Sequence, residues 1–415
     1  MRLAGAAIST AFLAEFTTLV PVFRSDLQAY LGIQDGAFGV LLSVSSLTGI
    51  VAVLLGGALV DRWGPGPVVR GCAVGMAAGM AVIAAAGTRF WLVAAGLGLT
   101  GLFGRPLAVA VSAYLVGLFP AAQRRLLSVN LAVGALGGVA VPALAEGLLR
   151  LWRSSVGFSF GWIFHGPLAL AAVLMAAAAV PHRRSADRPG PVGGNLSWRW
   201  RDLWLPRSTL ALCVLAAVHG AADNTLYLWM ARFLGGSAFA DRPLAPGLVL
   251  SAFSLGYAVS RLALAFVPDG VGRRALLFWP GLLGGVVLLA GLCLRGYAWT
   301  ATGYIIGGLL WSLEYPAFLS AITLCEPRRC GAALALSHVL SGLLSFVALT
   351  AVGMAASRGG DAAMWRVLVS LSALFPCVGL GGALWLRWHG GLLGASRAAM
   401  SAGNRASPGA GQSGG

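Results

Sequence analysis

The chain has 415 residues, of which 58% are hydrophobic and only 10% charged, and its mean hydropathy is +0.83. A soluble domain carries about 25% charged residues, so the composition excludes an ordinary soluble protein. All 29 basic residues are arginine, against 13 acidic residues, and the net charge is +16. In a soluble protein this excess would suggest a nucleic-acid partner. Beside apolar segments, arginine instead reports membrane topology, and we expect no nucleic acid.

Apolar runs of about 18 or more residues recur along the chain, each long enough to cross a hydrocarbon core. The runs are continuous and do not alternate with polar residues, which excludes a transmembrane β-barrel. We therefore predict an all-α polytopic membrane protein with twelve spanning helices. The expected spans are residues 4–23, 36–60, 67–87, 91–118, 126–149, 160–180, 208–234, 245–267, 274–294, 298–324, 330–356 and 364–387.

Two stretches interrupt the apolar pattern and set the expected domain boundaries. Residues 181–207 are rich in Arg, Pro, Gly and Trp, and they divide the spans into six and six. Residues 388–415 end in Gly, Ser and Ala without periodicity, which predicts a disordered cytoplasmic tail. The six-helix bundles are expected at 1–180 and 208–387, joined by a cytoplasmic loop.

The placement of arginine predicts the orientation, because cytoplasmic loops carry the excess of basic residues. If the N-terminus is cytoplasmic, eighteen arginines fall on the inner side and nine on the outer side. We therefore expect both termini inside. The first run holds Glu15 and has no convincing cleavage region, so we interpret it as a retained span and not as a signal peptide.

A short polar motif and its distant copy indicate an internal repeat. Residues 57–64 read GALVDRWG and directly follow the second span. Asp61 has a counterpart at Asp269, 208 residues later and after the eighth span. The same offset carries Glu15 onto Asp223. Two six-span halves in the same orientation form the parallel-repeat architecture of many transporters.

At this point the sequence resembles the major facilitator superfamily over about residues 1–390. The family pattern G-x-L-x-D-R-x-G is matched by Gly57, Leu59, Asp61, Arg62 and Gly64. The resemblance implies two six-helix bundles that move a small solute by alternating access. It also implies a multi-pass protein of the cell (inner or plasma) membrane that acts as a monomer and needs no cofactor.

The resemblance further implies an inner gate, with two departures from the family pattern. Pro65 and Gly66 stand where basic residues are usual, and Gly270 replaces the arginine of the second copy. The charge network of the gate is therefore thinner than usual. The implied gate residues are Gly57, Asp61, Arg62, Gly64, Arg261, Asp269, Gly272 and Arg273.

A narrower similarity links the chain to the fucose:proton-symporter-like members of the family. It rests on Gly220-Ala-Ala-Asp223 followed by Trp229 in the seventh span, on Arg261, and on Tyr315-Pro316 in the tenth.

Charged residues inside spans are the best functional candidates, because one at the bilayer centre costs at least roughly 2.5–3.5 kcal/mol. Glu15, Arg105, Asp223 and Glu314 fall in spans one, four, seven and ten, which line the central cavity in the superfamily. Burial disfavours a charged carboxylate, so such groups can bind and release protons. The proton-coupling candidates are Glu15, Asp223 and Glu314. Glu146 and Arg261 are the remaining charged residues, and a surface role suits Glu146.

Substrate-binding candidates follow from the same spans. The fork of Arg105 suits an anionic substrate group, although a buried ion pair with Glu15 or Glu314 explains Arg105 equally well. Aromatic rings stack on sugars or apolar ligands, and ordinary packing is the alternative for each. The full set of candidates is Arg105, Asn224, Trp229, Trp311 and Tyr315.

His219 lies one helical turn before Asp223, so the two share a helix face. This spacing allows a proton relay, while a structural hydrogen-bonded histidine is the plainer interpretation.

The sequence predicts no enzyme and no metal site, because it lacks phosphate-loop and zinc-protease motifs. We predict proton-coupled uptake of a small polar or anionic metabolite, with small solutes, protons and lipid as the partners. Proton-driven efflux of drugs or metabolites is the first alternative. A non-transporting membrane sensor with the same fold is the second.

Overall fold

A computed structural model of the protein describes residues 2–33, 35–119, 122–154, 159–181, 205–236, 239, 244, 246–267, 272–327 and 329–405. Every regular element in these ranges is helical. The N-terminal half comprises α1 (Arg2–Ala14), the 3₁₀ turn η1 (Glu15–Thr18), α2 (Leu19–Val22), α3 (Arg24–Leu31), α4 (Asp35–Trp63), α5 (Pro65–Ala85), α6 (Phe90–Leu118), α7 (Gln123–Ser154) and α8 (Phe160–Ala179).

The C-terminal half repeats this plan with two long helices joined end to end. It comprises α9 (Arg207–Leu234), α10 (Pro246–Phe266), α11 (Arg273–Leu276), α12 (Trp279–Cys293), α13 (Tyr297–Trp311), α14 (Glu314–Cys325) and α15 (Cys330–Arg405). Gly360 breaks α15 with a φ of 57° and a ψ of −153°. Glycine lacks the Cβ that disfavours this left-handed φ, so α15 consists of two helices with a sharp turn between them.

The structure confirms the all-α class of the sequence prediction. Nine helical segments of the described chain are long and apolar enough to cross a membrane. Leu3–Thr18 and Trp279–Cys293 are shorter apolar helices, and α4 is 29 residues long.

The terminal segment differs from our expectation of a disordered tail from residue 388. α15 continues as far as Arg405. The loop expected at 181–207 lies mostly outside the described residues.

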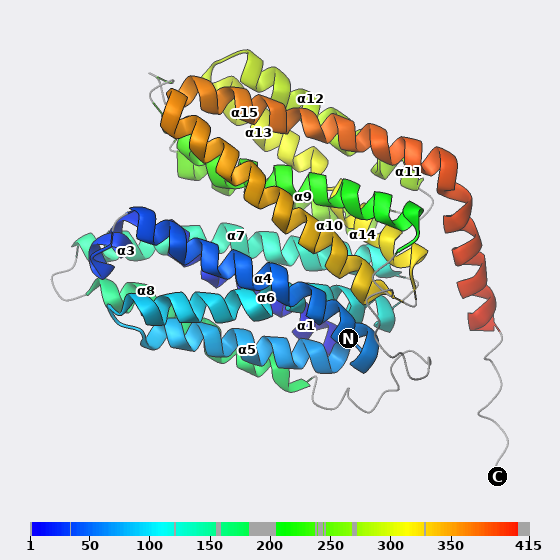
Figure 1. Cartoon of the computed structure of the whole chain (residues 1–415), viewed down its shortest axis with the longest axis horizontal. Coiled ribbons are helices and arrows are strands. Elements are labelled where there is room, and N and C mark those ends of the chain that lie inside the picture. Colours follow the sequence, from blue (N-terminus) through cyan, green and yellow to red (C-terminus); the bar gives the residue numbers. More distant parts are fainter. Residues whose placement is uncertain are drawn as a thin grey trace, which may run out of the picture.

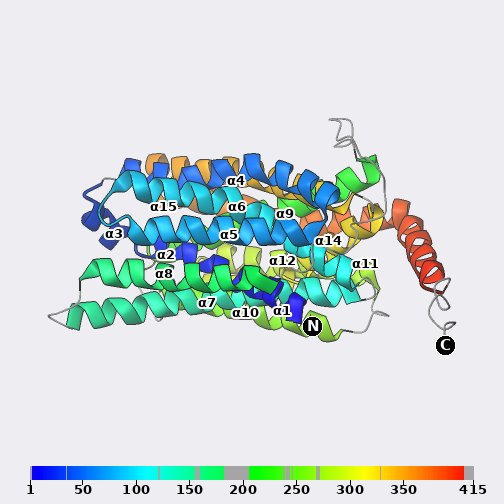
Figure 2. The ribbon, with the colours of Figure 1, turned by 90° about the horizontal axis from the view of Figure 1, so that it is seen from below.

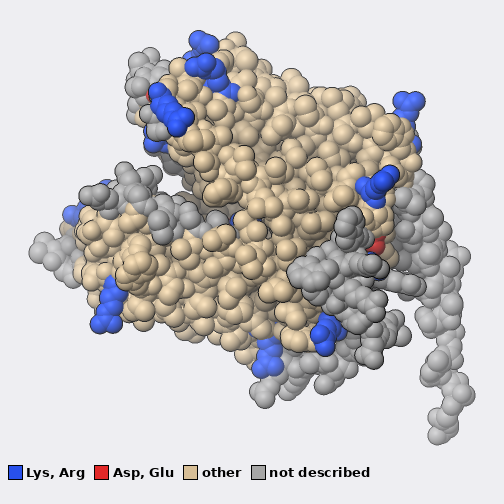
Figure 3. All heavy atoms as spheres, viewed as in Figure 1, with Lys and Arg blue, Asp and Glu red and all other residues tan. Residues whose placement is uncertain are grey.

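The two halves lie side by side and meet at one end of the molecule (Figures 1 and 2). They converge where the N-terminus, α14 and the start of α15 lie, and they diverge toward the end that holds α3. A surface view shows a hollow between the halves at the diverging end (Figure 3). On the same face, the charged side chains of the described chain gather near the two ends, as expected for an apolar belt in lipid.

Two sets of contacts hold the halves together at the converging end. On one side, Asp61 at the end of α4 accepts hydrogen bonds from the backbone N–H groups of Gly331 and Ala332, at 2.9 Å each. On the other side, Arg124 of α7 donates to the carbonyl of Val267 after α10, at 2.7 Å.

The first span is broken at Glu15. α1 ends at Ala14, and the Thr17 and Thr18 hydroxyls bond back to the carbonyls of Ala14 and Glu15 at 2.9 and 2.6 Å. Pro21 lacks the N–H that would continue the α-helical ladder. A 3₁₀ turn within a helix often marks a functional position.

The tenth span is broken at Glu314 for the same physical reasons. α13 ends at Trp311, the Ser312 hydroxyl bonds back to the carbonyl of Leu309 at 3.1 Å, and α14 begins at Glu314. Pro316 removes another donor from the ladder. Both broken spans therefore carry an acidic residue at the break.

Candidate functional site

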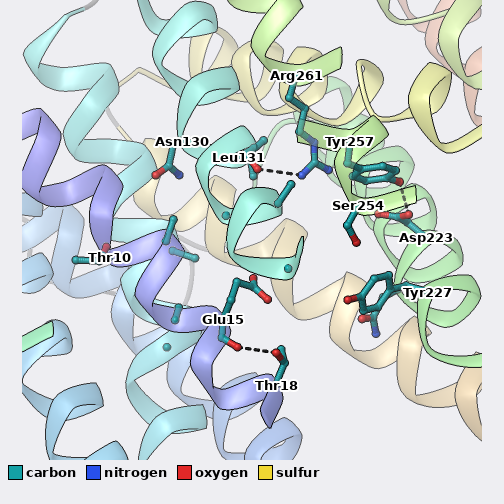
Figure 4. A pocket seen from close by; sticks show the side chains of 18 of the residues that line it. Thr10, Glu15, Thr18, Asn130, Leu131, Asp223, Tyr227, Ser254, Tyr257 and Arg261 are labelled. Carbon is teal, nitrogen blue, oxygen red and sulfur yellow. Dashed lines mark hydrogen bonds between the residues drawn. The ribbon is translucent and has the colours of Figure 1, made fainter. Parts of the chain in front are cut away.

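A cavity of about 480 Å³ lies between the two halves (Figure 4). Six elements line it: α1, η1, α6 and α7 from the N-terminal half, and α9 and α10 from the C-terminal half. The N-terminal wall is smooth because it is largely Ala and Gly, whereas the C-terminal wall carries aromatic rings. The polar lining residues are Thr10, Glu15, Thr18, Asn130, Asp223, Asn224, Tyr227, Ser254, Tyr257 and Arg261.

Glu15 reaches the cavity from the break in the first span. Its stem packs against Gly137 of α7, where an added Cβ would come within 2.8 Å of the Glu15 Cγ. Only glycine allows this approach, so Gly137 fixes the course of the side chain. Figure 4 shows the Glu15 carboxylate on the wall opposite Asp223. No described side chain donates a hydrogen bond to this carboxylate, so it is available to a proton or a ligand.

Asp223 faces the cavity from α9 and is held by two donors. The Tyr257 hydroxyl donates to Asp223 Oδ1, and the Trp311 indole N–H donates to the same oxygen at 3.2 Å. The indole N–H also contacts the Tyr257 hydroxyl. Residues from α9, α10 and α13 therefore fix the orientation of one carboxylate.

Arg261 extends into the cavity from α10 and is 9% exposed. Its guanidinium lies over the Tyr257 ring, 4.4 Å from the centroid, and Nη1 donates to the carbonyl of Leu131 at 3.3 Å. Its own carbonyl accepts a hydrogen bond from Ser128 at 2.6 Å. The Nε–H is buried and has no partner within the described structure. Arg261 therefore links the two halves.

Glu314 does not line this cavity. It is fully buried in the C-terminal half, where Oε2 lies 2.9 Å from His219 Nδ1. Gly281 of α12 makes room for it, since an added Cβ there would come within 2.5 Å of Glu314 Oε2. His219 also stacks on Tyr315 and meets Phe375 edge-on. His219 thus pairs with Glu314, although Asp223 lies one turn away on α9.

Arg105 also lies outside the cavity lining. It packs between α4 and α15 against two glycines. A Cβ added at Gly49 would come within 2.6 Å of the Arg105 Cδ, and a Cβ added at Gly342 would come within 3.2 Å of the Arg105 Nη1. No described carboxylate forms an ion pair with it, so pairing with Glu15 or Glu314 is not present in this structure. The guanidinium that reaches the cavity belongs to Arg261.

The other predicted substrate-binding residues are split between the cavity and the core. Asn224 lines the cavity. Trp311 is buried behind the wall and touches Asp223, and Tyr315 packs on His219. Trp229 lies under the guanidinium of Arg232, 5.6 Å from the ring centroid, and not in the lining.

The expected gate residues also lie in different parts of the structure. Asp61 contacts the first turn of α15, whereas Arg261, which we expected at the gate, lies in the cavity. Asp269 falls outside the described residues, and α11 begins at Arg273.

Sequence reasoning missed Tyr257 and Asn130. Tyr257 precedes Arg261 by four residues, so helical spacing alone places it on the same face. Asn130 lies in the cavity wall, is 6% exposed, and has a buried Oδ1 without a partner among the described residues. A polar residue in an apolar span was the only signal for Asn130.

The arrangement suits a polar ligand. Arg261 Nε–H and Asn130 Oδ1 are unpartnered, and buried polar groups without partners cost free energy until a ligand or water satisfies them. Two carboxylates on opposite halves can each hold a proton. No group of three or more His, Cys, Asp or Glu side chains in the described chain is placed to hold a metal ion.

We expect Tyr257→Phe to lower substrate transport by about tenfold, because it removes one of the two donors that hold Asp223. The ring under Arg261 is retained, so the effect reports the hydroxyl. Initial uptake rates in proteoliposomes measure the change. Tyr304→Phe is the matched control, since the Tyr304 hydroxyl is buried and has no partner in the described chain. Equal rates for the two variants would contradict the role of Tyr257.

We expect His219→Ala to lower the free energy of unfolding by about 1–3 kcal/mol, because it leaves Glu314 buried without its partner. Glu314→Gln should cost less, since its amide can still donate to His219. Unfolding in mixed micelles, followed by tryptophan fluorescence, gives both values. A His219→Ala variant as stable as wild type would show that the pair contributes nothing to packing.

Comparison with known proteins agrees with this architecture. The family model described as Major Facilitator Superfamily matches residues 5–241, more than half of the chain. A search of curated proteins found no match.

Solved structures share the fold over nearly the whole chain. FucP, a Major Facilitator Superfamily transporter in the outward conformation, aligns with a TM-score of 0.71 and 12% identity, over 92% of this chain and 98% of that one. A variant of the E. coli fucose:proton symporter FucP gives 0.70 and 12%, with the same coverage. The proton:xylose symporter XylE bound to 6-bromo-6-deoxy-D-glucose gives 0.67 and 14%, over 93% and 94%. At these identities the likeness concerns the fold alone.

The match of the family model to more than half of the sequence, together with the shared fold, identifies the chain as a member of the Major Facilitator Superfamily, and hence as a multi-pass membrane protein, a secondary transporter and not an enzyme.

Proposed function

We propose that the protein couples the inward flow of protons to the uptake of a small, uncharged solute that carries several hydroxyl groups. The observation that carries this proposal is the pair of carboxylates, Glu15 and Asp223, that face one cavity from opposite halves. Alternating access moves one half against the other around such a site. Each carboxylate can then exchange its proton with whichever side the cavity faces.

The lining favours a hydroxylated solute over an anion. Two carboxylates and one guanidinium line the cavity, and the guanidinium is already engaged by the Tyr257 ring and the Leu131 carbonyl. A hydroxyl can donate to the Glu15 carboxylate, which no described side chain engages. The faces of Tyr227 and Phe253 offer stacking surfaces for a ring. FucP and XylE, which share the fold, are described as proton symporters of fucose and xylose.

The proposal includes the orientation and setting of the protein. We place both termini in the cytoplasm and the protein in the cell (inner or plasma) membrane, where it works as a monomer. The bundles correspond to residues 1–180 and 208–387, with Asp61 at the inner gate. The excess of arginine on the inner side supports this orientation.

A panel of solutes tests the proposed function. Purified protein is placed in proteoliposomes with a pH-sensitive dye inside, and sugars, polyols, carboxylates or lipophilic cations are added outside. We expect sugars or polyols to acidify the lumen and the other classes to have no effect. Acidification by carboxylates alone would contradict the uncharged class. Proton release from the lumen driven by a lipophilic cation would favour efflux.

A further inference from the structure

A buried pair of titratable side chains, His219 and Glu314, lies behind the C-terminal wall of the cavity, and neither residue lines it. They are 1% and 0% exposed, and His219 Nδ1 lies 2.9 Å from Glu314 Oε2. Their other polar atoms, His219 Nε2 and Glu314 Oε1, are buried without a partner in the described chain. Such a pair is weak evidence for stability, because the desolvation of both groups offsets their attraction. The pair therefore needs an explanation other than the packing of the core.

The pair fixes the break in the tenth span. α13 ends at Trp311 and α14 begins at Glu314, so the regular helix is interrupted between them. The carbonyl of Ser312 receives no helical hydrogen bond, because Pro316, four residues later, has no N–H. The bond between Glu314 and His219 ties this interruption to α9. It thereby holds the end of α13 in one position beside α9.

Trp311 connects the break to the cavity. It is the last residue of α13, three residues before Glu314, and its indole N–H donates to Asp223 Oδ1 at 3.2 Å. His219 lies four residues before Asp223, so both face the same side of α9. α9 therefore contacts the broken span twice, through His219 and through Asp223. The position of the indole relative to Asp223 depends on the position of Glu314 relative to His219.

Phe375 of α15 links the same residues through their rings. Trp311 stacks on Phe375, with 4.2 Å between the ring centroids and 13° between the planes. His219 meets the Phe375 ring edge-on, at 5.3 Å and 87°. Trp311 and Phe375 are fully buried, and close-packed interiors transmit a change of shape to their neighbours. A change at His219 therefore reaches the indole by two routes, the backbone at the break and the Phe375 ring.

We propose that His219 and Glu314 are positioning residues for Asp223: their pair fixes Trp311, and Trp311 holds the Asp223 carboxylate toward the cavity (Figure 4). Neither residue touches the solute or carries the transported proton. The inference rests on the proposed function in one respect, namely that Asp223 exchanges a proton with the cavity. Glu314 thus has a role different from that of a proton carrier, which its place in an apolar span suggested.

Infrared difference spectra between acidic and alkaline pH test this positioning on the full-length protein in proteoliposomes, without any solute. The band of the protonated Asp223 carboxyl group is the one that disappears in Asp223→Asn. Trp311→Phe removes the indole donor but keeps a ring on Phe375. It should move this band to higher frequency, because a hydrogen bond weakens the C=O bond. His219→Ala should move the band equally, and the double variant should move it no further, since both changes act through one contact.

A conservative variant and a matched control separate positioning from general damage. Glu314→Gln should leave the band in place, because its amide can still bond to His219 Nδ1. Trp385→Phe removes a different buried hydrogen bond between α9 and α15, from the indole N–H to the carbonyl of Ser208 at 2.7 Å. Ser208 lies about 22 Å along α9 from Asp223. Trp385→Phe should therefore lower the stability and leave the band unchanged.

Replacing both members of the pair, His219→Leu with Glu314→Leu, gives a second test if His219→Ala does not fold. Apolar residues of similar volume in place of a buried pair are usually tolerated, yet the band should still move. A band that stays in place in these variants, or that moves as far in Trp385→Phe, would overturn the positioning. A band that moves in Glu314→Gln as in His219→Ala would also overturn it. The expected shifts in a protein that no sugar or polyol acidifies would support the positioning and contradict the proposed transport.

Discussion

Glu15→Gln and Asp223→Asn should each reduce proton-driven accumulation of substrate by about 100-fold, the usual scale for loss of a proton-transferring group. Both substitutions keep the size of the side chain and its capacity to accept a hydrogen bond. The amide introduced by Asp223→Asn can still accept from the Tyr257 hydroxyl and the Trp311 indole, so the wall of the cavity should be preserved. The loss therefore reports the missing proton site and not a collapsed cavity.

Exchange of labelled for unlabelled substrate distinguishes coupling from binding. With the same pH on both sides of the membrane, each variant should still exchange substrate, because exchange requires the cavity but no net proton movement. Glu146→Gln is the matched control, since Glu146 is 57% exposed and pairs with Arg150 at 3.1 Å. It should accumulate substrate like the wild type. Accumulation retained in both Glu15→Gln and Asp223→Asn would place the proton site elsewhere, with Glu314 the next residue to test.

These two carboxylates could be predicted from the sequence, whereas the position of Glu314 could not, and one physical reason explains both. An acidic residue within an apolar span is costly in lipid, so Glu15 and Asp223 are visible without a structure. The direction in which a side chain points is not visible, because these helices are apolar on nearly every face. Glu314 was therefore assigned to the cavity, although Gly281 leaves it a site inside the C-terminal half and His219 pairs with it there.

The positions of the arginine side chains could not be predicted for a related reason. Arg105 and Arg261 both lie within apolar spans, and the sequence does not show which one reaches the cavity. The slot for Arg105 is formed by Gly49 and Gly342, which lie far apart in the chain and meet only when the halves pack. Tyr257 could have been predicted from its spacing to Arg261. The helix breaks at Glu15 and Glu314 could also have been anticipated, because Pro21 and Pro316 lie close behind them.

The fold itself followed from simpler rules. Counting apolar runs against the thickness of a bilayer predicted the all-α class, and the long helices lie within a few residues of the predicted spans. α15 consists of two helices that separate at Gly360, between the expected spans 330–356 and 364–387. How the two halves pack depends on contacts such as those of Asp61, which the sequence motif indicated only by resemblance.

Asp61→Asn should raise the rate at which Cys330 reacts with a maleimide by about tenfold or more, since each hydrogen bond to a charged group contributes roughly 1.5–3 kcal/mol. The Asp61 carboxylate accepts from the N–H groups of Gly331 and Ala332 with its two oxygens, both at 2.9 Å. Asparagine replaces one oxygen with an NH₂ group that would face an N–H. It also removes the negative charge from the N-terminal end of α15, where a charge is stabilising.

Cys330 is a native reporter of this contact. It begins α15 in the C-terminal half, yet it packs against the core of the N-terminal half. Separation of the halves at this end should therefore expose its thiol. The backbones also meet closely here, since an added Cβ at Gly57 would come within 2.5 Å of the Cβ of Ala335. Any opening must therefore move α4 and α15 apart as units.

The measurement uses a background in which the other five cysteines are alanine, so that Cys330 alone is labelled. Arg62→Gln serves as the control, because Arg62 is the exposed neighbour of Asp61 and should leave the labelling rate unchanged. If Asp61→Asn and Arg62→Gln label at the same rate, the two hydrogen bonds do not hold this end closed. A faster rate in Asp61→Asn alone, reversed when substrate binding restores the closed form, would show that Asp61 biases the balance between the two orientations of the cavity.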